Sequence, residues 1–94
     1  MVIQNERYKK NLGAFTEEEL RHVWKQSVCI VGCGGIGGHV IMSLARFGVG
    51  KLTLVDGDVF TVSNLNRQIF CTEQNLMQQK ATATKAALAE INSE

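Results

Sequence analysis

The chain has 94 residues, of which 45% are apolar and 20% charged, a composition typical of one small folded domain and not of a disordered segment. Ten basic and nine acidic residues leave a formal charge of +1, which excludes the strongly basic surface of a dedicated nucleic-acid or anionic-membrane binder. The N-terminus lacks a signal-peptide pattern, and no apolar run approaches the roughly 18 residues of a membrane span. We therefore expect a cytoplasmic protein without a membrane or nucleic-acid partner.

The first regular element in the sequence is a helix. Thr16 and Glu19 form a capping box, in which the threonine hydroxyl accepts from the third helical N–H and the glutamate reaches back to the cap. Phe15 and Leu20 flank this box at the two positions of a hydrophobic staple. The pattern predicts a helix over residues 16–26.

The residues before this helix carry basic side chains around Tyr8 and are interpreted as a short arm or helix over residues 5–11. Together with the predicted helix they form an N-terminal helical arm, residues 1–26. The expected second part, residues 27–94, contains eight of the nine glycines and no proline, which indicates a region of tight turns.

Two short apolar runs in this second part predict strands. Val28–Val31 and Leu52–Val55 are too short for helices and suit strands that are covered on both faces of a parallel sheet. The segment between them predicts a helix that Gly48 can close in a left-handed conformation. Its apolar side chains recur at helical spacing: Ile36, Val40, Leu44 and Phe47, with Ile41 and Ala45 beside them.

Strand, helix and strand make one right-handed βαβ unit. Residues 78–92 are rich in Ala, Lys, Gln and Glu and predict a further helix. A third strand would be expected next, where the chain stops, so the sheet is expected to be incomplete. The sequence therefore indicates an α/β fold, a Rossmann-like parallel sheet preceded by N-terminal helices, with residues 27–94 a truncated nucleotide-binding portion.

The cysteines are expected to be reduced. Three is an odd number, which does not fit a disulfide framework, and two of them lie in the apolar strand pattern. We therefore expect Cys29, Cys33 and Cys71 to be buried free thiols. The spacing of Cys29 and Cys33, with no nearby histidine pair, is poor for zinc.

A glycine-rich turn follows the first predicted strand and opens the predicted helix. In that context the backbone can approach a ligand closely, and free N–H groups and the helix dipole face an anion. The pattern G-x-G-x-x-G is typical of nucleotide or dinucleotide sites, and its alternative is a turn needed only for packing. The residues that we expect to bind in this turn are Gly32, Gly34, Gly35 and Gly37.

Asp56 ends the second predicted strand, where an acidic side chain can accept hydrogen bonds from ribose hydroxyls. The alternative is a turn-forming aspartate before Gly57. Asp58 fits a binding role and a structural role equally well. The acidic residue therefore favours a nucleoside with free hydroxyls.

Two cations follow this acidic residue. A nicotinamide dehydrogenase does not need them, whereas an enzyme that cleaves a nucleoside triphosphate needs cations against developing phosphate charge. Arg67 offers a fixed fork of donors and Lys80 a compact ammonium at a helix start. Either cation alone would be interpreted as a solvated surface residue.

These blocks resemble the E1-like activating enzymes of the thiamine and molybdenum-cofactor pathways, the ThiF, MoeB and HesA group. The resemblance covers almost the whole chain, and its most specific block is Ser-Asn-Leu-Asn-Arg-Gln at residues 63–68. It implies binding of ATP with Mg²⁺ and attack by the C-terminal carboxylate of a small ubiquitin-like sulfur carrier on the α-phosphate. Pyrophosphate leaves, and an acyl-adenylate remains.

The resemblance also implies residue roles. Asp56 and Asp58 would belong to the nucleotide site, and Asn64, Arg67, Gln68 and Lys80 would line the phosphate path. Lys10, from the arm of the second subunit of a homodimer, would join Arg67 and Lys80 as catalytic groups, although the family usually has Arg there. Met77 stands where the family commonly has Gly.

The magnesium-binding Asp and any zinc-binding cysteine pairs of the family would lie beyond residue 94. The 94-residue piece alone is therefore expected to be inactive. Two alternatives stay open, an NAD-binding module of an oxidoreductase and a non-catalytic E1-like subunit. Within the adenylating class, a carboxylate carried on tRNA is a further possible substrate.

Overall fold

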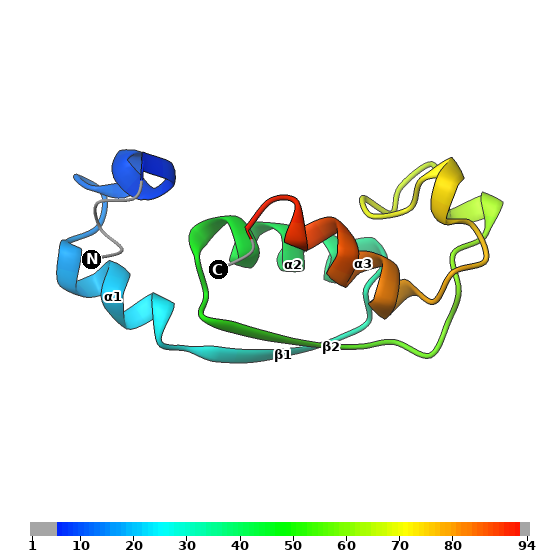
Figure 1. Ribbon diagram of the computed structural model, residues 1–94, viewed down its shortest axis with the longest axis horizontal. Coiled ribbons are helices and arrows are strands. Elements are labelled where there is room, and N and C mark those ends of the chain that lie inside the picture. The colour runs from blue at the N-terminus through cyan, green and yellow to red at the C-terminus, as the bar shows by residue number, and fades with distance from the viewer. Residues whose placement is uncertain (1–5, 93–94) are drawn as a thin grey trace.

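A computed structural model describes residues 6–92 of the chain. The elements appear in the order that the sequence predicts, with three short 3₁₀ helices in addition (Figure 1). They are η2 (Glu6–Asn11), α1 (Glu17–Trp24), β1 (Ser27–Val31), α2 (Gly35–Phe47), β2 (Lys51–Val55), η3 (Val62–Asn64), η4 (Glu73–Asn75) and α3 (Lys80–Ala89).

The predicted βαβ unit is confirmed. β1 and β2 pair in parallel, in a register that runs from Ser27 opposite Lys51 to Val31 opposite Val55. α2 makes the crossover between them and ends at Gly48, whose φ of 97° is the predicted left-handed cap. The fold is therefore α/β, with a two-stranded parallel sheet among the described residues.

The expectation that both faces of the strands are covered is wrong for the described residues. α2 and α3 both lie on the same side of the sheet (Figure 1), because successive right-handed crossovers in one direction place their helices on one face. The other face is open, and Val31 is 79% exposed there. Cys29 is exposed for the same reason, which corrects its predicted burial, whereas Cys33 and Cys71 are buried free thiols as predicted.

The core forms between this sheet face and the two helices. Its buried members include Ile41 and Ala45 of α2 and Leu88 of α3, together with Phe60 and Phe70 from the connection between β2 and α3. The sequence predicts a different main apolar stripe for α2, formed by Ile36, Val40, Leu44 and Phe47. Of these, the structure leaves Ile36 and Val40 exposed.

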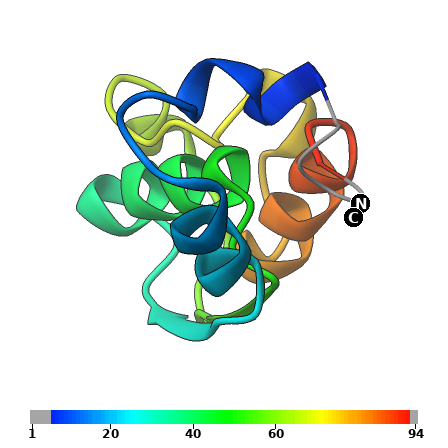
Figure 2. The same ribbon diagram turned by 90° about the vertical axis from the view of Figure 1, so that its left-hand side faces the viewer.

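The N-terminal segment docks at the end of the molecule where α2 finishes (Figure 2). The predicted capping box of Thr16 and Glu19 is present, although α1 ends at Trp24. The Tyr8 and Trp24 rings lie 5.1 Å apart between centroids. The Asn92 side-chain amide donates to the Tyr8 hydroxyl and to the Ala45 carbonyl, both at 3.0 Å. The last described turn is thus bound to the arm.

α3 is shorter than the predicted helix over residues 78–92. Its first two predicted residues are not helical, because the Gln78 carbonyl accepts from the Phe60 N–H at 3.0 Å and the extended Gln79 forms a bridge with Val59. Met77 immediately before them has a φ of 69°, a left-handed conformation that favours glycine. This backbone requirement explains why a glycine would suit that position.

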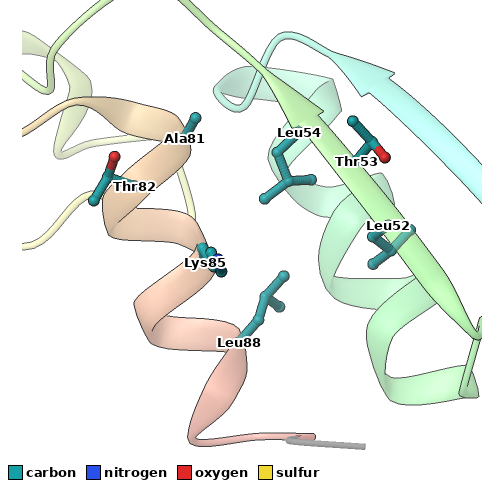
Figure 3. Close-up of a pocket in the computed structure, with 7 residues that line it drawn as sticks. All are labelled: Leu52, Thr53, Leu54, Ala81, Thr82, Lys85 and Leu88. Atoms are coloured by element: carbon teal, nitrogen blue, oxygen red, sulfur yellow. The ribbon is translucent and has the colours of Figure 1, made fainter.

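A groove of about 370 Å³, lined by both apolar and polar residues, lies between β2 and α3 (Figure 3). Leu52 and Leu54 project toward α3, from which Leu88 faces them, while Thr53 points to the other side of the strand. The groove follows β2 and contains none of the glycines of the predicted nucleotide loop. It therefore lies on the face of the sheet that carries the helices and is separate from the candidate site.

Candidate nucleotide-binding site

The glycine-rich loop joins the carboxyl end of β1 to α2, the place where open parallel sheets bind ligands. Gly32 has a φ of 97°, and its N–H donates to the Val55 carbonyl at 2.7 Å. A Cβ on Gly37 would lie 1.9 Å from the Gly32 carbonyl oxygen. Glycine at these two positions is therefore needed for the turn itself, whatever the loop binds.

The loop presents uncapped helix amides. The N-cap of α2 is Gly34, which has no side chain to accept from the first turn, so those N–H groups have no intrahelical acceptor. At Gly35 the space that a Cβ would enter contains no other group within 4 Å. Because the helix dipole adds a partial positive charge at this end, the loop is suited to bind an anionic group such as a phosphate.

The Asp56 carboxylate fixes the backbone of this loop through hydrogen bonds. Its Oδ2 accepts from the Cys33 N–H and its Oδ1 from the Asp58 N–H, both at 2.8 Å. Partial burial raises the pKa of Asp56, but the two N–H donors and the nearby Lys80 together outweigh burial and hold the pKa below its ordinary value. Asp56 is therefore a carboxylate that orders the loop, and its predicted contact with ribose stays a prediction.

The depressed pKa gives Asp56 a testable effect on stability. Asp56→Asn should lower the free energy of unfolding at pH 7 by about 2 kcal/mol, because each N–H bond to the charged carboxylate is lost or weakened. A depressed pKa contributes stability above the unfolded value near 4, and this contribution is lost as the pH falls through the folded value. Chemical denaturation at pH 7 and pH 3 should therefore show a smaller difference between wild type and variant at pH 3. An equal difference at both pH values would contradict this role.

Lys80 is the first residue of α3 and is only 8% exposed. Its ammonium lies 5.8 Å from the centroid of the Phe60 ring. Its backbone N–H donates to the Asp58 carbonyl at 2.9 Å, so Asp58 connects Lys80 to Asp56. Among residues 6–92, no carboxylate lies within 4 Å of the ammonium. A largely buried cation is thus available for an anion that the described chain does not itself provide.

Cys33 lies within the loop and is fully buried. Burial raises the pKa of its thiol, and the neighbouring Asp56 raises it further against the opposing effect of Lys80. The thiol is therefore protonated at neutral pH and is unsuited to act as a nucleophile. Its backbone N–H, which the sequence analysis did not consider, is the group that contributes to the site.

Gln68 and Asn64 are both buried. A Cβ on Gly34 would lie 2.2 Å from Gln68 Oε1, so the amide lies directly against the glycine backbone. Gln68 Oε1 is buried without a hydrogen-bond partner among the described residues. Asn64 stabilises its own turn, because its Oδ1 accepts from the Thr61 N–H at 2.9 Å. The unpartnered Gln68 Oε1 could accept from a hydroxyl or amino group of a nucleotide.

Arg67 and Lys10 are placed differently from Lys80. Arg67 is exposed, and its Nη1 donates to the Ser63 carbonyl at 2.8 Å and to Asn66 Oδ1 at 3.0 Å. The guanidinium is therefore folded onto its own turn, with its other donors still available. Lys10 belongs to the arm, at the opposite end of the molecule from the loop (Figure 1). The structure does not bring Lys10 to the glycine loop of its own chain.

Phe60 is a site residue that sequence reasoning missed. Its fully buried ring lies under the Lys80 ammonium and so fixes where the cation sits. Nothing in the local pattern distinguishes it from an ordinary core aromatic. Its partner lies twenty residues further along the chain, and only the fold brings the two together.

The comparison with protein families matches this chain, from residue 8 to residue 94, to the ThiF family. The chain belongs to the ThiF family. Two curated relatives of this ThiF-family chain have different names, one a dehydratase and the other an adenylyltransferase and sulfurtransferase. It is 36% identical over 87 residues to the tRNA threonylcarbamoyladenosine dehydratase of Bacillus subtilis (strain 168), covering 93% of the chain and 34% of the relative. It is 37% identical over 89 residues to the adenylyltransferase and sulfurtransferase MOCS3 of Arabidopsis thaliana, covering 93% of the chain and 19% of the relative.

A solved structure places a nucleotide in the same fold. The E. coli tRNA N6-threonylcarbamoyladenosine dehydratase TcdA in complex with ATP superposes with a TM-score of 0.92 at 33% identity, covering 100% of this ThiF-family chain and 40% of that protein. The chain thus spans about a third or less of the length of the two curated relatives. In residues 6–92, no helix is long and apolar enough to cross a membrane.

Proposed function

We propose that this ThiF-family chain is the ATP-binding part of an enzyme that adenylylates the C-terminal carboxylate of a ubiquitin-like sulfur carrier. The observation that carries the proposal is the convergence of uncapped amides at Gly34 and Gly35 with the buried Lys80 ammonium beside Asp56. A polyphosphate fits this combination, because it needs both amide donors and a desolvated cation. The relatives named as adenylyltransferases and the ATP complex of TcdA support it.

In the proposed reaction, a carboxylate oxygen attacks the α-phosphorus of ATP. The bond from that phosphorus to the bridging oxygen breaks, pyrophosphate leaves and an acyl-adenylate forms. The loop amides would hold the phosphates, and Lys80 would stabilise the negative charge that grows on the leaving group. Gln68 would donate from its amide, while Arg67 would turn from its own loop toward the phosphates. Asp56, beside the loop, would accept from the ribose with its remaining lone pairs.

Other parts of the proposal concern the whole protein. We propose that it is a cytoplasmic homodimer in which Lys10 of the partner subunit acts at the phosphates. Mg²⁺ would be held by an aspartate beyond residue 94, and a zinc site, if present, would also lie there. Residues 6–92 contain no group of three His, Cys, Asp or Glu side chains that could hold a metal ion. The division into an arm, residues 1–26, and a nucleotide-binding portion, residues 27–94, belongs to the same proposal.

A second substrate class has support of its own. The identity to the tRNA threonylcarbamoyladenosine dehydratase, 36%, is close to the identity to MOCS3, 37%. The ATP chemistry would be the same, with a carboxylate carried on tRNA in place of a protein C-terminus. The two substrates are distinguished by supplying each in turn to the complete protein.

The deciding experiment is exchange of labelled pyrophosphate into ATP by the complete protein. Exchange is expected with a ubiquitin-like carrier and not with a carrier that lacks its terminal carboxylate. Arg67→Ala should slow exchange by roughly 10²–10³-fold, the cost of losing one donor that stabilises developing charge. Arg21→Ala, which removes an exposed arginine of α1 that pairs with Glu17, is the matched control.

Three outcomes would overturn the proposal. Exchange that needs no carboxyl substrate, or none with any carrier or tRNA, would remove adenylylation. Thermal stabilisation by NAD together with none by ATP would favour an oxidoreductase module instead. Full activity in a homodimer would exclude a non-catalytic subunit.

A further inference from the structure

The Arg67 guanidinium is held on its own turn by two uncharged acceptors. Its Nη1 donates to the Ser63 carbonyl at 2.8 Å and to Asn66 Oδ1 at 3.0 Å. Within the part of the chain that the structure describes, no carboxylate lies within 4 Å of this guanidinium. A hydrogen bond from a guanidinium to a charged oxygen is roughly twice as strong as one to a neutral acceptor. A phosphate can therefore displace both present acceptors.

The turn that carries Arg67 does not depend on the Asn66 side chain. Its backbone is closed by the Gln68 N–H, which donates to the Asn64 carbonyl at 2.9 Å, and by the Asn64 side chain, which caps Thr61. Asn66 is exposed and does not have a left-handed φ. In the described chain its side chain forms one hydrogen bond, the one from Arg67. The side chain of Asn66 therefore acts on Arg67 and not on the fold.

The guanidinium has room to move from this position. A hollow of about 510 Å³ is lined by Arg67 and Gln68, with His39 of α2 among its other members. Gln68 also lies against Gly34, so the hollow adjoins the glycine loop. The described residues that line it include no aspartate or glutamate that would compete with a phosphate for the guanidinium. Because exposed side chains change rotamer readily, Arg67 can turn toward the loop without a backbone movement.

We propose that Asn66 is a positioning residue, which sets how readily Arg67 leaves its turn for the phosphates of ATP. This inference rests on the proposed function. Before ATP binds, Asn66 and Ser63 hold the guanidinium; once ATP is bound, the phosphates hold it. The apparent affinity for ATP is then the intrinsic affinity reduced by the fraction of molecules in which Arg67 is released.

The amide of Asn66 suits this role because of its intermediate strength as an acceptor. A carboxylate at this position would form an ion pair with the guanidinium and compete with the phosphates. A side chain without an acceptor would leave the Ser63 carbonyl as the remaining partner. The two kinds of replacement should therefore change ATP affinity in opposite directions.

The test measures ATP binding to the complete protein by calorimetry, and pyrophosphate exchange at varied ATP concentration. Asn66→Asp should raise the dissociation constant and the KM for ATP by roughly fivefold, the effect of one exposed ion pair. Asn66→Ala should lower both by roughly threefold, since one exposed hydrogen bond is lost. The kcat at saturating ATP should stay unchanged in both variants, because every bound complex already has Arg67 at the phosphates.

Two controls separate this effect from general changes in charge or fold. Gln74→Glu makes the same change of charge at an exposed residue of the same connection and should leave ATP binding unchanged. In the Arg67→Ala background, Asn66→Ala should no longer alter the affinity, and any increase that Asn66→Asp still causes there measures direct repulsion of ATP. Circular dichroism verifies that each variant is folded.

The outcomes distinguish this inference from the proposed function. Shifts of the same sign in the two Asn66 variants, or unchanged ATP affinity in both, would overturn the positioning role. An effect of Asn66→Ala that persists without Arg67 would do the same, as would a fall in kcat without a change in KM. A wild-type protein that binds no ATP would instead overturn the proposed nucleotide site, and this inference with it.

Discussion

Gly37→Ala is expected to lower the free energy of unfolding by about 3 kcal/mol, the upper part of the usual range for inserting a group into filled space. The added Cβ would lie 1.9 Å from the Gly32 carbonyl oxygen. This oxygen cannot move away cheaply, because the Gly32 N–H is hydrogen-bonded to the Val55 carbonyl at the end of β2. Relief of the clash therefore requires that α2 shift away from β1.

Gly57→Ala is the matched control. No group lies within 4 Å of the Cβ that it would add, and Gly57 does not have a left-handed φ. The free energy of unfolding of the Gly57→Ala variant is expected to stay the same or to rise by up to about 1 kcal/mol, because alanine restricts the unfolded chain. Thermal and urea denaturation compare the two variants, and ATP-dependent stabilisation should be lost in Gly37→Ala only. Equal melting temperatures would show that the loop tolerates the additional methyl group.

Lys80→Met is expected to slow pyrophosphate exchange by about 10³-fold, the upper end of the effect of one charge-stabilising group. Methionine keeps an unbranched chain in the space above Phe60 and removes the ammonium. Lys80 is only 8% exposed, so solvent screens its ammonium little. The fold is expected to persist, as circular dichroism would verify.

The same variant has a second readout that does not depend on catalysis. Lys80 lowers the pKa of Asp56, so its removal should raise that pKa and move the acid-side loss of stability to higher pH. Lys85→Met, which neutralises an exposed lysine of the same helix, is the control for both measurements. Unchanged exchange in Lys80→Met would exclude this lysine from the reaction. An unchanged acid transition would instead contradict its influence on Asp56.

Local signals in the sequence predicted most elements of the fold. The Thr16 capping box, the left-handed cap at Gly48 and the two apolar runs each depend on neighbours within a few residues, and all are present. The end points of α3 were wrong because they depend on distant groups. The Gln78 carbonyl accepts from the Phe60 N–H, a contact between two segments that no helix propensity describes.

Burial was harder to predict than secondary structure. Cys29 and Ile36 look like core residues by pattern, yet both are exposed because the described residues cover only one face of the sheet and one side of α2. Side-chain contacts in the candidate site were also hard to predict from the sequence. The glycine spacing predicted the loop correctly, but it could not reveal that Asp56 would use both carboxylate oxygens to hold it. Such contacts form because the ends of two strands lie side by side, which the sequence alone does not show.

The bond between Asn92 and Tyr8 joins positions separated by 84 residues of sequence. Closing a loop of this length costs chain entropy, which the packing of the intervening elements must offset. The Trp24 ring packs against the same Tyr8 in a tilted arrangement, and Trp24 is the single tryptophan of the chain. The intrinsic fluorescence of Trp24 therefore reports whether the last described turn and the arm are in contact through Tyr8, without any added label.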